Sequence, residues 1–476
     1  MGGEGWRGNS PYSKDIRLTT TKYPMKPHQI IAPWKGDKRF TDIAKRAAAL
    51  KKAGQDVDGI LAAITAEFGA PTALLGLRDE PAPYRVFGTV GDRHAAIGES
   101  NADIEYGALA QLQLALRLPI AERGALMPDA HPGYALPIGG VFRAYNSVAP
   151  AMVGVDIACR MMLSVFAIEP DEFVRQRTHL FSILKQVTTF GAGAERSYAA
   201  DHEVLDDSRW GLTSQLRGLR ARGAAQLGTS GSGNHFTELV VGETLQALIP
   251  GAPANFAGLL SHSGSRGVGY AVANHYMKVA EQETKRIAQV PRFYEWLDLE
   301  REAGQEYWAA MELCGAYASA NHHVIHELFA RRTKLPVAAQ IENHHNFAWR
   351  QGELVIHRKG ATPAEAGVLG IIPGSMATPS YIVAGTGSED SLMSTSHGAG
   401  RRGSRTWAKQ TIGMGDVRRM LAQQDVLVEG VSADESPFAY KDIERVMQLQ
   451  EEAGLLTRVA RMRPIAVLMA GEEGVD

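Results

Sequence analysis

Short apolar runs separated by glycine-rich turns fill most of this chain beyond Pro119, and long helical segments interrupt them. Apolar runs bounded by turn residues predict β-strands, whereas apolar residues at helical spacing predict helices. The predicted strands cover residues 148–155, 161–168, 239–241, 259–260, 354–356 and 381–383. The predicted long helices cover about 271–290, 301–330 and 440–460. This mixture predicts an α+β fold, with a single large domain of mixed β-sheets and flanking helices.

A separate N-terminal extension is predicted for residues 1–85. Residues 40–66 have helical spacing with basic residues on the polar side, so this extension is expected to be partly or mostly helical. The segment 80–83, Glu-Pro-Ala-Pro, breaks the pattern and indicates a boundary. The large domain is expected to span residues 86–476, with an amphipathic helix over 103–118 that Pro119 ends.

The composition restricts the class of protein. Hydrophobic residues make up 45% of the 476 positions and charged residues 21%, which is typical of a globular protein. The formal net charge is −2, so the overall charge does not indicate nucleic acid and any anion site must be local. Two cysteines cannot form a disulfide framework. Residues 1–20 lack the apolar core of a signal peptide, and no apolar run is long enough to span a membrane, so a cytoplasmic protein is predicted.

Asp156 and Cys159 lie three residues apart, where an apolar run ends. At the exit of a strand, this offset can point a carboxylate and a thiolate at one metal ion, and a thiolate can also bridge two ions. The alternative is a buried free cysteine that serves as a small hydrophobic residue beside a helix-capping aspartate.

Three histidines lie beside glycine, serine or asparagine: His235, His262 and His345. The first two flank predicted strands, where loops can converge on one site, although each could equally be a hydrogen-bonded structural residue. His344 precedes His345, and neighbouring residues cannot both face one ion. A thiolate, a carboxylate and several imidazoles suit manganese, zinc or iron. A structural zinc site is disfavoured, because these residues are not arranged in closely spaced pairs.

Residues 394–401 read Ser-Thr-Ser-His-Gly-Ala-Gly-Arg and contain a fourth histidine, His397. Consecutive backbone N–H groups in such a turn can form an anion-binding nest, and Arg401 and Arg405 can hold a phosphate with paired hydrogen bonds. Residues 370–376 and Ser380 form another compact loop with hydroxyl groups. The alternative is an ordinary glycine-rich turn with a solvent-facing histidine. Neither a P-loop nor a dinucleotide-binding pattern occurs.

Together these motifs resemble the RtcB family of GTP-dependent RNA-splicing ligases, over about residues 85–470. The resemblance is specific because many motifs occur in one order. They lie at residues 127–131, 154–159, 231–238, 262–267, 345–346, 358–361, 372–376, 396–401 and 439–442.

The resemblance implies a manganese site, usually of two ions, with Cys159 as the bridging ligand. It implies as ligands Asp156, Cys159, His235, His262 and His345. It also implies that His397 attacks the α-phosphate of GTP to give a histidine–GMP intermediate. The guanylyl group would pass to an RNA 3′-phosphate, formed where necessary from a 2′,3′-cyclic phosphate, and a 5′-hydroxyl end would then attack.

The resemblance further implies two sets of binding residues. The nucleotide-binding set is Asn234, Glu238, Asn346, Gly374, Ser375, Ser380, Gly398, Ala399, Gly400 and Tyr440. The set that binds RNA or phosphate is Arg266, Arg401 and Arg405. The expected partners are therefore GTP and RNA with 3′-phosphate and 5′-hydroxyl ends.

Three positions depart from the family pattern. The C-terminal lysine of the family falls on Ala470, which an acidic tail follows. The loop 131–135 lacks a lysine, and Arg160 replaces a glycine, which is expected to add charge beside the metal ions. These departures leave two alternatives open. The chain could bind or cap 3′-phosphate ends after losing ligation, or it could hydrolyse cyclic phosphates.

Overall fold

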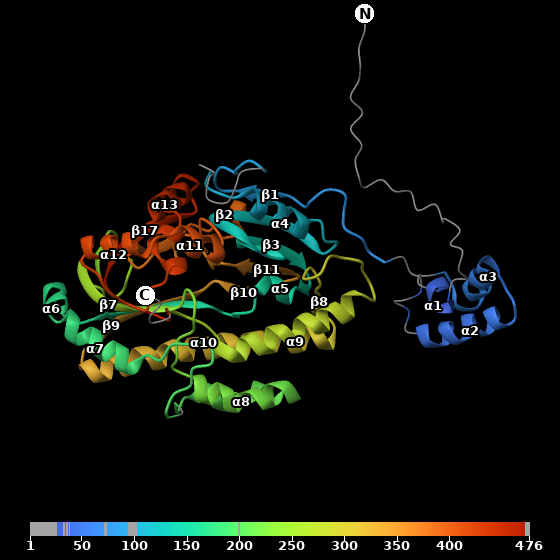
Figure 1. Cartoon of the computed structure of the whole chain (residues 1–476), viewed down its shortest axis with the longest axis horizontal. Coiled ribbons are helices and arrows are strands. Elements are labelled where there is room, and N and C mark those ends of the chain that lie inside the picture. Colours follow the sequence, from blue (N-terminus) through green and yellow to red (C-terminus); the bar gives the residue numbers. More distant parts are fainter. Residues whose placement is uncertain are drawn as a thin grey trace, which may run out of the picture. The chain divides into compact units, whose positions relative to one another are not determined.

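The computed structural model describes residues 26–31, 34, 37, 39–70, 74–93, 102–198 and 200–471. Residues 1–25 and the acidic tail 472–476 lie outside this range. Contacts divide the chain into two compact units, Met1–Leu74 and Leu75–Asp476 (Figure 1). In the described part, no helix has both the length and the apolar character needed to cross a membrane.

The smaller unit contains three helices, α1 (Pro27–Ile30), α2 (Phe40–Lys52) and α3 (Val57–Phe68). Its core is the buried cluster Ile30, Ile31, Trp34, Ile43, Ala47, Leu50, Ile60 and Ile64. The sequence predicted one helical segment over 40–66, but Gly54 adopts φ +82° and ends the first helix. The Asp56 carboxylate then accepts a hydrogen bond from the Gly59 N–H and starts the second helix.

The larger unit is built on two main sheets. The five-stranded sheet has the order β1-β2-β3-β11-β10. Its strands are β1 (Tyr84–Val86), β2 (Ala121–Tyr134), β3 (Leu136–Tyr145), β10 (Asn346–Gln351) and β11 (Leu354–Lys359). Helix α4 (Tyr106–Leu116) packs on β2 and β3, where Leu112, Leu116 and Phe142 are fully buried.

The eight-stranded sheet has the order β13-β14-β17-β6-β7-β5-β9, and β16 pairs with β17. Its strands are β5 (Arg160–Phe166), β6 (Phe236–Thr244), β7 (Asn255–Ser263), β9 (Val337–His344), β13 (Leu369–Ile372), β14 (Ser380–Gly385), β16 (Leu427–Glu429) and β17 (Leu456–Met469). Two short pairs complete the strands, β4 (Ser147–Val148) with β8 (Leu297–Asp298), and β12 (Ala361–Pro363) with β15 (Ser394–Ser396).

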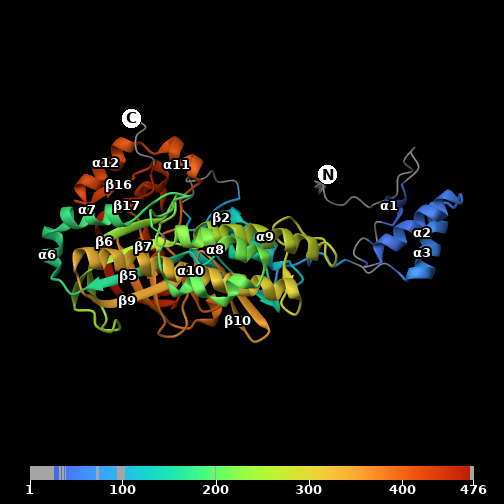
Figure 2. The same ribbon diagram turned by 90° about the horizontal axis from the view of Figure 1, so that it is seen from below.

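Long helices cover one side of the large sheet. Helix α10 (Glu302–Thr333) contacts β5 and β7, α9 (Arg266–Thr284) packs on α10, and α8 (Ser214–Gln226) packs on α9 (Figures 1 and 2). Tyr276, Tyr307 and Tyr317 are fully buried between them. The remaining α-helices are α5 (Pro150–Val153), α6 (Pro170–Arg175), α7 (Arg177–Val187), α11 (Arg405–Thr411), α12 (Met414–Gln423) and α13 (Ile443–Glu452).

The α+β expectation is confirmed, while several predicted elements are wrong in detail. The helix predicted over 440–460 ends at Glu452, because Gly454 turns the chain with φ +65° into β17. Half of the strand predicted over 148–155 is helix α5, which Pro150 can begin because the first turn of a helix needs no backbone N–H there. The segment 75–83 packs with the larger unit, since Leu75 pairs with Ala288 and Ala82 joins the core beneath α4.

Candidate metal centre and nucleophile

The turn between α5 and β5 carries Asp156 and Cys159. The Cys159 N–H donates to the Asp156 carbonyl oxygen at 3.2 Å, and Ala158 adopts the left-handed φ of 57°. The Ala158 N–H donates to the carbonyl oxygen of Asn346, and the Asn346 side chain donates to the carbonyl oxygen of Asp156. Two hydrogen bonds with Asn346 hold this tight turn, which directs the carboxylate and the thiol to the same side.

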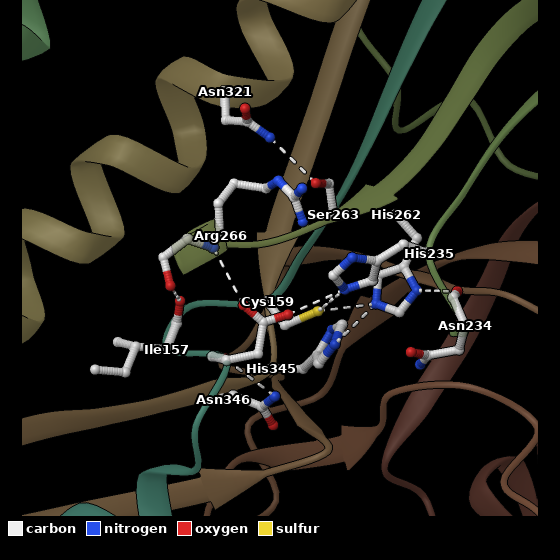
Figure 3. A network of polar contacts seen from close by, with 12 residues as sticks. Ile157, Cys159, Asn234, His235, His262, Ser263, Arg266, Asn321, His345 and Asn346 are labelled. Atoms are coloured by element: carbon white, nitrogen blue, oxygen red, sulfur yellow. Dashed lines mark hydrogen bonds and ion pairs between the residues drawn. The ribbon is translucent and has the colours of Figure 1, made fainter. Parts of the chain in front are cut away.

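Five side chains meet at this turn. Figure 3 labels Cys159, His235, His262 and His345 among them. Cys159 Sγ lies 3.1 Å from Nε2 of His262 and 3.4 Å from Nε2 of His235. Asp156 Oδ2 lies 3.0 Å from Nε2 of His235, and Nε2 of His345 lies 3.3 Å from Nε2 of His262. The ligand atoms form two groups that share Cys159. One is Asp156, Cys159 and His235, the other Cys159, His262 and His345, and the atoms of each lie within 4.8 Å of one another.

The order of the strands explains why residues so distant in sequence meet. Strands β6, β7, β5 and β9 are neighbours. His235 directly precedes β6 and His262 lies near the end of β7, opposite Phe236. Cys159 precedes β5 and His345 follows β9, and Arg160 pairs with both Ser263 and His344. All these side chains therefore lie at one end of the sheet.

Hydrogen bonding and burial set the protonation state of the imidazoles. His262 Nδ1 lies 2.9 Å from the carbonyl oxygen of Asn234, so this nitrogen carries the proton and Nε2 presents its lone pair to Cys159 and His345. Burial lowers the pKa of His262 to about 3 and the pKa of His345 well below its usual value. Neutral imidazoles with lone pairs converging beside a thiol fit a dication, and the donor set suits manganese, zinc or iron.

Two glycines give the cluster its space. A Cβ atom at Gly231 would collide with the His235 ring, and one at Gly264 would collide with the Asp156 carboxylate. Both glycines lie in sequence motifs noted above, and close approach of the backbone is the physical reason for them.

His397 lies beside this cluster, at the end of β15. Its ring centroid is 5.1 Å from that of His345. Its Nδ1 lies 2.7 Å from Oδ2 of Asp129, a residue of β2 with no solvent exposure, and its backbone N–H donates to the same oxygen at 3.1 Å. The Nδ1–H therefore donates to the carboxylate, and Nε2 is left with its lone pair free. Sequence reasoning missed Asp129 as a functional residue, because nothing in the spacing links it to His397.

A cavity of about 240 Å³ opens next to His397. It contains most of the residues that the resemblance assigned to nucleotide binding, together with two of the three arginines. They are Asn234, Glu238, Gly374, Ser375, Ser380, Gly398, Ala399, Gly400, Tyr440, Arg401 and Arg405. Asn346 and Arg266 do not line it. Asn346 holds the Asp156 turn, and Arg266 donates to Thr229 and Gly191, which anchors the loop behind His235.

The two arginines that line the cavity differ in how many acidic partners they have. Both terminal nitrogens of Arg401 are buried without a hydrogen-bond partner among the described residues, although Nη1 lies 3.6 Å from Glu435. Arg405 forms ion pairs with Asp434, at 2.8 Å, and with Glu435. Burial raises the pKa of Glu238 to about 8. A buried guanidinium with unused donors favours an anionic ligand in this cavity.

Arg160 contributes less to the cluster than the sequence suggested. Its guanidinium forms an ion pair with Glu342 at 2.8 Å and donates to the carbonyl oxygen of Gly315. The carboxylate of Glu342, on the neighbouring strand β9, therefore largely neutralises the extra charge that was expected beside the cluster.

The site combines a histidine held by a buried carboxylate, a thiol–imidazole–carboxylate cluster and a cavity lined by a buried arginine. This combination is typical of an enzyme that uses nucleophilic catalysis. Comparison with known proteins narrows this class. A family model described as "tRNA-splicing ligase RtcB" matches residues 111–217 and 211–470. The chain belongs to the RtcB family, which confirms the resemblance seen in the sequence.

Curated relatives from different organisms are 31–32% identical to this chain in sequence. The chain is 32% identical over 381 residues to RNA-splicing ligase RtcB1 of Escherichia coli, covering 73% of this chain and 91% of the relative. It is 32% identical over 421 residues to tRNA-splicing ligase RtcB of Thermococcus kodakarensis, covering 72% and 86%. It is 31% identical over 409 residues to RNA-splicing ligase RtcB of Mycobacterium tuberculosis, covering 71% and 95%.

Proposed function

We propose that this chain is an RNA ligase that uses GTP and manganese and joins RNA 3′-phosphate or 2′,3′-cyclic phosphate ends to 5′-hydroxyl ends. The family membership and the names of the relatives support the ligase activity. The observation that carries the nucleotide chemistry is the arrangement of His397, whose Nε2 is free while Asp129 holds Nδ1.

His397 is the proposed nucleophile. Its Nε2 attacks the α-phosphorus of GTP, a P–N bond forms, and the bond to the β-phosphate oxygen breaks to release pyrophosphate. The ring gains positive charge as the P–N bond forms, and the Asp129 carboxylate stabilises that charge through the Nδ1–H. Imidazole is also a good leaving group, so the guanylyl group can be passed on.

Two later steps transfer the guanylyl group to RNA and then join the two RNA ends. An oxygen of the RNA 3′-phosphate attacks the guanylyl phosphorus and the P–N bond breaks, which restores His397. The 5′-hydroxyl of the second RNA end then attacks the RNA 3′-phosphorus, and GMP leaves with its oxygen. Arg401 is the proposed partner of the phosphates, because neither of its terminal nitrogens donates a hydrogen bond to another described residue.

The two groups that share Cys159 are the proposed manganese ligands, Asp156, Cys159 and His235 for one ion and Cys159, His262 and His345 for the other. Bound manganese would neutralise the phosphate oxygens and orient them for in-line attack. The cavity beyond His397 is the proposed guanosine site, with Glu238, Ser380 and Tyr440 among its polar side chains.

The test is the intact mass of the protein after incubation with GTP and manganese. One added guanylyl group is expected, and it should be lost in acid and kept in alkali. The variant His397→Ala should not acquire it, whereas His323→Ala should, because His323 lies on α10 with 37% of its side chain exposed. Labelling of His397→Ala would reassign the nucleophile, and no labelling of the intact protein would overturn the proposal.

The second candidate is a protein that binds 3′-phosphate ends without sealing them. Ala470, at the position of the family lysine, and the altered loop 131–135 favour it. It would bind 3′-phosphorylated RNA while giving neither the adduct nor a joined product. Hydrolysis of cyclic phosphate ends without GTP would instead indicate a phosphodiesterase.

A further inference from the structure

Tyr134, at the end of β2, lies against Phe293, and helix α9 carries a third aromatic residue with an exposed side chain, Tyr270. We call Tyr134, Tyr270 and Phe293 the aromatic platform. Tyr134 is 41% exposed and Tyr270 is 60% exposed. The rings of Tyr134 and Phe293 lie 5.7 Å apart between centroids. Burial, followed by the electrostatic effect of the Tyr270 hydroxyl, raises the pKa of the Tyr134 phenol.

The backbone holds Phe293 in this position at a cost. Phe293 adopts φ +76°, in the left-handed region that bulky residues rarely enter. The next residue fixes it, because the Tyr294 hydroxyl donates to the carbonyl oxygen of Ala135 at 2.9 Å. Strained conformations of this kind are concentrated at functional positions.

Cations accompany the platform. The Arg292 guanidinium lies 4.6 Å from the centroid of the Phe293 ring, and Arg292 is exposed. The Lys359 amino group lies 4.1 Å from the centroid of the Tyr134 ring and donates to the carbonyl oxygens of Tyr134 and Ala151, and burial lowers its pKa to about 7. Because Lys359 covers one face of Tyr134, the exposed part of that ring belongs to its other face and its edge.

Lys359 also connects the platform to the catalytic centre. The next residue is Gly360, where a Cβ atom would lie 3.1 Å from Cε1 of His397. On its other side, the Lys359 side chain lies against Gly154, two residues before Asp156. The residue whose side chain covers the Tyr134 ring therefore also lies against Gly154 and directly precedes the glycine that faces His397.

We propose that the aromatic platform stacks an unpaired base of the RNA strand whose end is being joined. Exposed aromatic faces accompanied by cations fit unstacked bases and their phosphates, and they do so with little sequence preference. Lys359 and Gly360 link the Tyr134 ring to His397, so the proposed occupant is the end of an RNA strand, which can reach from the platform to the reacting phosphate. This inference rests on the proposed function, because it assumes an RNA substrate.

The test measures RNA binding separately from nucleotide chemistry. Fluorescence anisotropy should be recorded with two short single-stranded RNAs. One carries a 3′-phosphate and the other a 5′-hydroxyl, and in each the fluorophore is attached to the opposite end. The double variant Tyr134→Ala/Tyr270→Ala should bind one of these RNAs about tenfold more weakly than the unaltered protein. The variant Tyr145→Ala is the matched control, because Tyr145 is 53% exposed at the opposite end of β3.

Two further measurements connect the loss to stacking. Tyr134→Phe keeps an aromatic ring and should bind RNA as the unaltered protein does. An RNA with an abasic nucleotide at the stacked position should bind the unaltered protein about tenfold more weakly, with no further loss in the double variant. The guanylyl label on His397 should be unchanged in every variant, which also reports that the protein is folded.

Equal RNA binding by the double variant and the unaltered protein would overturn the inference. A series of abasic RNAs that all bind equally well would do the same. A loss of the guanylyl label only in the double variant would assign the tyrosines to the fold instead. Failure of the unaltered protein to acquire any label would remove the proposed function, while the RNA measurements would still decide the role of the platform.

Discussion

Nδ1 of His397 lies 2.7 Å from Oδ2 of Asp129, although 268 residues separate the two in sequence. The same carboxylate oxygen accepts the backbone N–H of His397, so both the ring and the main chain of the histidine are fixed by one buried group. The other oxygen, Oδ1, has no hydrogen-bond partner among the described residues. Asp129 therefore sets the tautomer of the proposed nucleophile as well as its position.

The first prediction is that Asp129→Asn slows formation of the guanylyl adduct by about 10²–10⁴-fold, because the amide can present a hydrogen to Nδ1 and favour the wrong tautomer. The rate should be measured by quenched-flow labelling with GTP and manganese. An unchanged rate in a folded variant would show that the carboxylate has no part in activating the ring. Glu105→Gln is a suitable control, since Glu105 is a half-buried carboxyl group that has no contact with His397.

The second prediction concerns metal binding. Cys159 belongs to both ligand groups, whereas His235 belongs to one. Cys159→Ser should therefore lose both manganese ions in equilibrium dialysis with metal analysis, and His235→Gln should lose one of them. Equal stoichiometry in the two variants would contradict a shared thiolate. Cys314→Ser provides the control, because this buried cysteine belongs to neither group.

The third prediction concerns Arg358, which is fully buried and supports the strand that leads to His397. Its guanidinium donates to Ser394 Oγ at 2.8 Å and to the carbonyl oxygen of Met393 at 2.8 Å, and it lies 4.5 Å from the centroid of the Trp349 ring. Arg358→Lys keeps the charge but cannot reproduce these hydrogen bonds. We expect urea unfolding to show a loss of about 2–4 kcal/mol. A loss below about 0.5 kcal/mol, as at ordinary surface positions, would contradict this role.

The fourth prediction concerns pH. Burial raises the pKa of Glu238 from 4.5 to about 8 in the folded state. Between these values the folded protein binds more protons than the unfolded chain, so this group makes the free energy of unfolding fall as pH rises from about 4.5 to about 8. Glu238→Gln lacks this titration, and its stability relative to the unaltered protein should therefore increase across that range. Urea unfolding at several pH values tests this, and parallel pH profiles would contradict it.

Much of the architecture could be predicted from local patterns. Residues 161–168, 239–241 and 381–383 are apolar runs between turns, and each overlaps a strand of the large sheet. Strand β17 was missed because its sequence, LTRVARMRPIAVLM, mixes charged residues and a proline with apolar ones. It nevertheless lies between β14 and β6, where pairing on both sides outweighs its weak local preference.

The candidate site was only partly predictable. Asp156 and Cys159 are close in sequence, and their shared direction could be expected from spacing alone. The meeting of His235, His262 and His345 depends on the order of strands β6, β7, β5 and β9, which no local pattern contains. Asp129 and the aromatic platform depend on contacts between distant segments, and a lone aspartate or tyrosine carries no signal of such contacts. Their roles, and those of the ligands, stay predictions until the measurements above are made.

Gly400 follows His397 by three residues and lies directly on the main chain of Asp129. It adopts φ +73°, and a Cβ atom there would collide with the Asp129 carbonyl group. Even alanine at this position would push the segments that carry Asp129 and His397 apart, and would break the hydrogen bond between the imidazole and the Asp129 carboxylate. A residue without a side chain thus determines how closely the proposed nucleophile can approach its buried carboxylate. A single methyl group added there should stop guanylylation as completely as removal of the imidazole ring.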